Sequence, residues 1–146
     1  MRVAIISAEA VPYSKTGGLG EVAAALPGAL IRLGHEVTVI LPRYRGVDAP
    51  ADGISHSFQM GATTVPVRFI ETTAPDGFKA VLVDVPELFD RDGLYGSGGR
   101  DFPDNAQRFA VLSRAALEYV RLKGERPSIP DSLLSIRDSE IAILSG

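Results

Sequence analysis

A strand, a loop, a helix and a second strand follow one another in roughly the first forty residues, and this order constrains the fold most. Residues 2–7 read RVAIIS, an apolar run rich in β-branched residues, which is typical of a parallel strand covered on both faces. Apolar residues then recur every three or four positions from Leu19 to Leu33 and predict a buried helical stripe. Gly34 suits the left-handed end of that helix, and residues 36–41 read EVTVIL. The pattern therefore predicts a βαβ unit in a parallel sheet.

Downstream of this unit the sequence predicts a hairpin, a third buried strand, a long loop and a second helix. Gly61 and Ala62 separate the two strands of the hairpin, and the turn at 75–77 leads into the buried strand. Pro27 lies inside the first helix and predicts a kink, because it removes one backbone hydrogen bond. The predicted ranges are 56–60 and 63–71 for the hairpin, 78–85 for the strand, 86–100 for the loop, and a helix that begins within 101–104 and ends near Gly124.

These elements predict one α/β domain over residues 1–124, built on a doubly wound and mostly parallel sheet. Residues 125–146 are interpreted as a divergent or truncated tail. Pro127 and Pro130 end the second helix there, and residues 140–144 suit one more strand.

Composition excludes several classes of protein. Apolar residues make up 45% and charged residues 23% of the chain, which is typical of a folded domain. A net charge of -3 gives no basic surface for nucleic acid. The absence of cysteine excludes disulfides and thiolate metal sites. No apolar run is long enough to cross a bilayer and no signal-peptide pattern is present, so we expect a cytoplasmic protein.

The segment Lys15-Thr16-Gly17-Gly18-Leu19-Gly20-Glu21 joins the first strand to the first helix. A doubly wound sheet binds its ligand beyond the carboxyl end of a strand, at this kind of junction. Gly17 and Gly18 would let an anion approach the free amides of the helix start, and Lys15 adds a positive charge. The segment matches neither a Walker loop nor the spaced-glycine dinucleotide fingerprint. On these residues alone, a phosphate site and a tight turn with a solvated lysine are both open interpretations.

Three separated blocks resemble glycogen and starch synthases, and together they cover most of residues 1–120. The first is EAVPYSKTGGLGEV at residues 9–22, and the second is LGHEVTVILPRY at residues 33–44. The third combines LFDRDGLYG at 88–96 with GRDFPDNAQRFA at 99–110. The resemblance implies the Rossmann-like N-terminal half of a GT-B glycosyltransferase. The family retains the anomeric configuration while it transfers glucose from ADP-glucose, or UDP-glucose in some members, to the non-reducing end of an α-1,4-glucan.

The resemblance also implies roles for individual residues of the donor site. It implies the nucleotide sugar and the α-glucan as ligands. No cofactor is expected, and no metal is needed if the protein supplies the positive charge, since the sequence shows no obvious cluster of metal ligands. Glu21 stands where most relatives have Asp. By resemblance, the site comprises Lys15 against the phosphates, Gly17 and Gly18 beside the diphosphate and glucose, Glu21, Tyr95 at the rim, and Asn105 with Arg108 as a polar pair.

Several of these positions have a purely structural interpretation as well. Tyr95 would then pack a loop against the core, and Asn105 with Arg108 would form local capping and surface contacts, because they lie three apart on one helical face. Asp101 and Asp104 are interpreted as helix-capping residues rather than as catalytic acids.

The resemblance stops short of a whole enzyme. The second, nucleotide-binding domain of the family is absent from this chain, and so is the His-Ala-His-Asp-Trp-like block that usually follows the second helix. The catalytic site is therefore incomplete, and we expect no detectable glucosyl transfer by this chain alone. The alternatives are a non-catalytic glucan-binding or interaction domain, a GT-B enzyme with another donor, and a dinucleotide-binding domain, which the ending Leu41-Pro42-Arg43 of the second strand disfavours.

Overall fold

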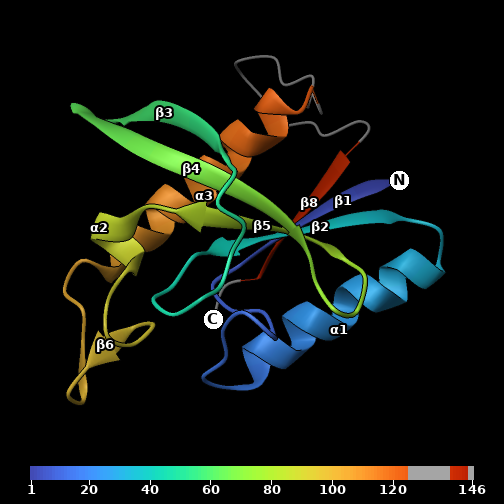
Figure 1. The fold of residues 1–146 in the computed structure, drawn as a ribbon, viewed down its shortest axis with the longest axis horizontal. Coiled ribbons are helices and arrows are strands. Elements are labelled where there is room, and N and C mark those ends of the chain that lie inside the picture. The colour runs from blue at the N-terminus through green and yellow to red at the C-terminus, as the bar shows by residue number, and fades with distance from the viewer. Residues whose placement is uncertain (125–138, 145–146) are drawn as a thin grey trace.

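A computed structural model of the chain describes residues 1–124 and 139–144, and a six-stranded sheet with the order β3-β4-β5-β2-β1-β8 forms its centre (Figure 1). The predicted strands and helices are present within a few residues of their expected bounds. The strands of this sheet are β1 (Arg2–Ser7), β2 (Glu36–Pro42), β3 (Ile54–Met60), β4 (Thr63–Thr73), β5 (Lys79–Asp84) and β8 (Ser139–Leu144), and the longer helices are α1 (Gly18–Arg32) and α3 (Asn105–Leu122).

Strand directions follow the predicted βαβ unit. β1 pairs in parallel with β2 and with β8, and β2 pairs in parallel with β5. The hairpin β3–β4 is antiparallel and continues the sheet beyond β5. The strand predicted at residues 140–144 is therefore present as β8 beside β1, whereas Pro127 and Pro130 lie outside the described residues. The domain boundary at residue 124 stays a prediction.

The two long helices cover opposite faces of the sheet (Figure 1). Because side chains alternate along a strand, Ile5 and Val39 face the α1 side and share a buried cluster with Ala23. Their neighbours Ile6 and Ile40 face the α3 side, where they pack in the cluster of its buried residues. This arrangement confirms the predicted doubly wound architecture.

Helix α1 runs without interruption from Gly18 to Arg32 through the buried Pro27. Gly34 has a φ of +86°, which confirms the predicted left-handed end of the helix. Glu21 lies in its first turn and Arg32 in its last, so both charges match the helix dipole. None of the helices within residues 1–124 combines the length and apolar character that a bilayer crossing requires.

The segment predicted as a long loop contains short elements instead. α2 (Pro86–Phe89) begins with a proline, which suits a first helical turn, and it buries Phe89 completely. A small hairpin of β6 (Gly96–Ser97) and β7 (Arg100–Asp101) follows. The interpretation of Asp101 and Asp104 as capping residues was wrong. Asp101 belongs to β7, and the Asp104 side chain accepts no hydrogen bond from the backbone of α3, because both of its oxygens accept from Arg91.

Candidate functional site

A pocket of about 630 Å³ opens beyond the carboxyl end of β1, between the first turns of α1 and α3. Its position confirms that the strand-to-helix junction borders a cavity. Four chain segments contribute to its wall. The lining residues are Ile6 and Ser7 at the end of β1 with Ala8 and Glu9 after it, Gly17, Gly18 and Leu19 at the start of α1, Tyr95 and Asp101, and Asn105, Phe109, Leu112 and Ser113 from α3.

Glu9 is a charged residue in this wall that is only 2% exposed. Its Oε2 accepts the backbone N–H of Thr16 at 2.6 Å, and its Oε1 accepts the Thr16 hydroxyl at 2.6 Å. The Tyr95 hydroxyl also donates to Oε1 at 2.6 Å. Burial by itself raises the pKa of Glu9, but the donors Thr16, Tyr95 and Gly17 outweigh burial, so the pKa lies below its ordinary value. The carboxylate therefore stays ionised at neutral pH.

Tyr95 lines the pocket with its ring while its hydroxyl is held by Glu9. Burial, followed by the hydrogen bond to Glu9, raises the pKa of Tyr95, so the phenol remains a donor at neutral pH. The backbone carbonyl of Tyr95 accepts the side-chain amide of Asn105 at 2.8 Å and the N–H of Phe102 at 2.8 Å. Hydrogen bonds within the protein thus fix both the hydroxyl group and the backbone carbonyl of Tyr95.

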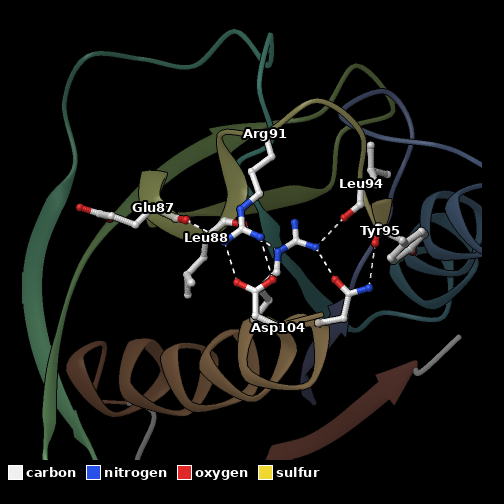
Figure 2. A network of polar contacts seen from close by, with 8 residues as sticks. Glu87, Leu88, Arg91, Leu94, Tyr95 and Asp104 are labelled. Atoms are coloured by element: carbon white, nitrogen blue, oxygen red, sulfur yellow. Dashed lines mark hydrogen bonds and ion pairs between the residues drawn. The ribbon is translucent and has the colours of Figure 1, made fainter. Parts of the chain in front are cut away.

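Arg108 is completely buried and does not line the pocket. Its Nε donates to the carbonyl of Leu88 at 2.7 Å, and its Nη1 donates to the carbonyl of Leu94 at 2.9 Å and to Asn105 Oδ1 at 2.7 Å. Burial lowers the pKa of Arg108. The expectation of surface contacts for this residue was wrong, because its guanidinium satisfies carbonyls of the segment that carries Tyr95. Figure 2 shows these carbonyls gathered over the start of α3.

A second arginine, Arg91, fixes the segment between α2 and α3 through more exposed contacts. Arg91 donates to both oxygens of Asp104 at 2.7 Å and to the carbonyl of Glu87 at 3.1 Å (Figure 2). The bidentate geometry joins the end of α2 to the start of α3. Together, Arg91 and Arg108 hold the pocket-lining segment against α3.

Lys15 and Glu21 lie beside the larger pocket and do not line it. They form an ion pair with each other, with 48% and 64% of their side chains exposed, beside a shallow depression next to α1. The hydrogen bond and charge of Lys15 lower the pKa of Glu21. Neither residue belongs to the wall of the larger pocket as the described residues form it. An exposed pair of this kind contributes little to stability, so a ligand anion would meet little resistance in displacing Glu21.

The three glycines of the junction differ in their surroundings. A Cβ at Gly17 or Gly18 would meet no protein atom within 4 Å. At Gly20 it would lie 3.0 Å from the carbonyl oxygen of Ser14 and 3.4 Å from Glu9 Oε2. Gly20 is therefore required by packing, whereas Gly17 and Gly18 leave space open at the pocket. No side chain caps α1 at Gly17, so within the described residues its first amides have no side-chain acceptor there.

The predicted site residues are thus only partly brought together. Gly17, Gly18, Tyr95 and Asn105 share the pocket, while Lys15 and Glu21 lie beside it and Arg108 lies beneath it. Their roles toward a ligand stay predictions. The residue that sequence reasoning missed is Glu9, together with its partner Thr16. The available signal was a carboxylate within an apolar stretch directly after a buried strand, where an unpaired charge would be costly.

Comparison with known proteins agrees with this geometry. The family described as the starch synthase catalytic domain matches residues 2–134. The glycogen synthase of Anaeromyxobacter dehalogenans (strain 2CP-C) is 45% identical over 133 residues, which is 88% of this chain and 27% of the relative. The glycogen synthase of Koribacter versatilis (strain Ellin345) is 40% identical over 140 residues, again 27% of the relative. The chain thus spans about a quarter of the length of these relatives.

A solved structure is similar as well. The catalytic domain of starch synthase IV from Arabidopsis thaliana, bound to ADP and acarbose, matches with a TM-score of 0.66 and 32% identity. The match covers 84% of this chain and 25% of that one. It confirms the predicted fold class, a Rossmann-like domain as in the N-terminal half of a GT-B glycosyltransferase. The extent and identity of these matches mean that the chain belongs to the starch synthase catalytic domain family.

Proposed function

We propose that this chain forms one wall of the donor site of a retaining glucosyltransferase, which transfers glucose from ADP-glucose to the non-reducing end of an α-1,4-glucan. The observation that carries the proposal is a pocket at the end of β1 bordered by two glycines whose open sides meet no protein atom. Family membership and the ADP and acarbose bound to the Arabidopsis relative support the choice of ligands. The proposal places the opposite wall in a second domain, because the matched region covers only 27% of the glycogen synthase of Anaeromyxobacter dehalogenans.

The proposed chemistry follows from charge. Breaking the bond between glucose and the diphosphate leaves negative charge on the departing phosphates, and positive groups aimed at them stabilise that transition state. Lys15 is the cation nearest to the first turn of α1 in sequence, and its partner Glu21 is exposed enough for a phosphate to replace it. The uncapped amides of that turn supply further donors. The protein itself thus supplies the positive charge, and the proposal includes no cofactor and a cytoplasmic location.

Replacing Lys15 tests the phosphate contact. Lys15→Ala is expected to weaken the binding of ADP-glucose roughly 10- to 100-fold, because a hydrogen bond to a charged group contributes about 1.5–3 kcal/mol. Isothermal titration calorimetry on the 146-residue chain measures this change. The matched control is Lys79→Ala, which also removes a half-exposed lysine with a glutamate partner but lies on β5. Equal affinities of the two variants would contradict the contact.

The same preparations separate the proposed function from its alternatives. We expect no glucosyl transfer by this chain alone, because half of the cleft lies in the second domain. Robust transfer that Lys15→Ala abolishes would contradict that expectation. Binding of acarbose without binding of ADP-glucose would instead support a glucan-binding domain.

Substitution of Gly18 tests whether the open glycines serve the ligand or the fold. Gly18→Ala is expected to leave the free energy of unfolding within about 0.5 kcal/mol of the wild type or to raise it, because the new methyl group meets no protein atom within 4 Å and Ala favours a helix. The affinity for ADP-glucose should nevertheless fall about 10-fold or more, since that methyl group occupies space at the pocket.

Gly20→Ala is the contrasting variant. Its methyl group would crowd the Ser14 carbonyl, so it should lower the free energy of unfolding by about 1–3 kcal/mol. Urea unfolding together with calorimetric titration distinguishes the two glycines. A loss of stability without a loss of affinity in Gly18→Ala would show that the glycine serves the fold.

A further inference from the structure

The buried carboxylate of Glu9 joins segments that are far apart in the sequence. Glu9 follows β1, Thr16 precedes α1, and Tyr95 precedes β6. Thr16 donates to the carboxylate from its N–H and its hydroxyl, and Tyr95 donates from its hydroxyl, each at 2.6 Å. One side chain therefore holds the glycine-containing junction against the segment that follows α2.

Protein donors take most of the acceptor capacity of this carboxylate. An ionised carboxylate offers about four lone-pair directions. Thr16 uses two of them and Tyr95 uses a third. Only 2% of Glu9 is exposed, although it borders the pocket. The carboxylate is therefore engaged mainly by the protein itself rather than by a ligand.

The first turn of α1 packs directly against the Glu9 carboxylate. A Cβ on Gly20 would lie only 3.4 Å from Glu9 Oε2, and the N–H of Val11 donates to the carbonyl of Gly20 at 3.1 Å. The orientation of Thr16 and Gly17 thus determines where the open sides of Gly17 and Gly18 point.

We propose that Glu9 is the positioning residue of the donor pocket. Its carboxylate holds the Thr16–Gly17 backbone and the Tyr95 ring in the arrangement that presents Gly17, Gly18 and the first amides of α1 to a nucleotide diphosphate sugar. Tyr95 then acts mainly through Glu9. The inference rests on the proposed function for the identity of the ligand, whereas the positioning role itself is measurable without any ligand.

Three variants of the 146-residue chain test this role: Glu9→Ala, Glu9→Gln and the control Glu36→Gln. Glu36 is an exposed residue at the first position of β2 and is the register partner of Arg2. Both lie at the amino ends of their strands, away from the carboxyl end of β1 where the pocket opens. Two quantities are measured for each. They are the hydrogen-exchange rates of the Thr16 and Gly17 amides by NMR, and the affinity for ADP-glucose by calorimetry.

Glu9→Ala should accelerate exchange of both amides about 10-fold or more and weaken ADP-glucose binding by a similar factor, because Thr16 loses its hydrogen bonds to a charged group and the adjacent Gly17 loses this anchor. Glu9→Gln should rescue both quantities to within about threefold of the wild type. Its carbonyl can accept the Thr16 amide while its NH₂ donates to the hydroxyls of Thr16 and Tyr95, which also act as acceptors. Glu36→Gln should change neither quantity. Rescue by the amide distinguishes positioning from a contact that needs the charge.

Unchanged exchange of Thr16 and Gly17 in a folded Glu9→Ala variant would overturn the inference, as would a Glu9→Gln variant no better than Glu9→Ala. If Glu9→Ala does not fold, Tyr95→Phe takes its place. It removes one donor and should accelerate Thr16 exchange about two- to threefold, and wild-type exchange there would overturn the inference. A wild-type chain that does not bind ADP-glucose overturns the proposal that this wall binds the donor by itself, while the exchange rates still decide the role of Glu9.

Discussion

Arg108→Ala is expected to lower the free energy of unfolding by about 3 kcal/mol. The guanidinium is completely buried, and it supplies the donors for the carbonyls of Leu88 and Leu94 and for Asn105 Oδ1. Each buried acceptor left without a donor costs about 1–3 kcal/mol. Loss of the buried charge offsets part of this sum, because that charge is itself costly to bury. Urea unfolding measures the change.

Arg114→Ala is the matched control on the same helix. Its guanidinium forms an i,i+4 ion pair with Glu118 and its side chain is 41% exposed, so its loss should cost about 1 kcal/mol or less. Arg108→Met is a second useful variant, because it fills most of the space but leaves the three acceptors without donors. If Arg108→Met were as stable as the wild type, the carbonyl contacts would not be the source of the effect.

Phe89→Ala is expected to cost about 3–5 kcal/mol of unfolding free energy. The ring is fully buried on α2 and packs edge-on against Tyr44, with ring centroids 5.8 Å apart. The guanidinium carbon of Arg108 lies 5.3 Å from its centroid. Truncation therefore leaves a cavity and removes both aromatic contacts. Thermal and urea unfolding should agree on the loss.

The control for this variant is Phe89→Leu, which keeps most of the apolar volume and should cost about 1–1.5 kcal/mol. Because Phe89 and Arg108 are in contact, their effects should not add. The double variant is expected to be more stable than the sum of the single changes implies, by about 0.5–1 kcal/mol. Strict additivity would show that the ring and the guanidinium act independently.

Both predictions concern the support of the candidate site. Arg108 and Phe89 lie behind the segment that carries Tyr95, whose hydroxyl reaches Glu9. A loss of stability at these positions should therefore be accompanied by looser packing around the pocket. This link connects the stability of α2 and α3 with the proposed donor site.

The elements of this fold could be predicted from the sequence because each depends on local regularities. Alternating or continuous apolar residues identified β1, β2 and β5, and three-to-four-residue spacing identified α1 and α3. The junction at residues 15–21 was located because it lies between a buried strand and a helix. The resemblance of three separated sequence blocks to a known family identified the family membership that the comparisons confirm.

The composition of the pocket was decided only by tertiary structure. Glu9 and Tyr95 are 86 residues apart, and nothing in either neighbourhood indicates the other. Arg108 was expected in the donor site or in local and surface contacts, yet two of its acceptors are backbone carbonyls 14 and 20 residues away. Asp104 was expected to cap its own helix, but both oxygens of its carboxylate accept hydrogen bonds from Arg91 instead.

The sequence by itself thus determined the strands, the helices, their order and the place where the chain opens a pocket. These follow from backbone preferences and from the burial of apolar side chains, which act over a few residues. Tertiary structure alone decided which polar groups meet at that pocket. A buried charge takes whichever donors or acceptors the packed fold brings within reach, because leaving it unpaired is far more costly than any local preference.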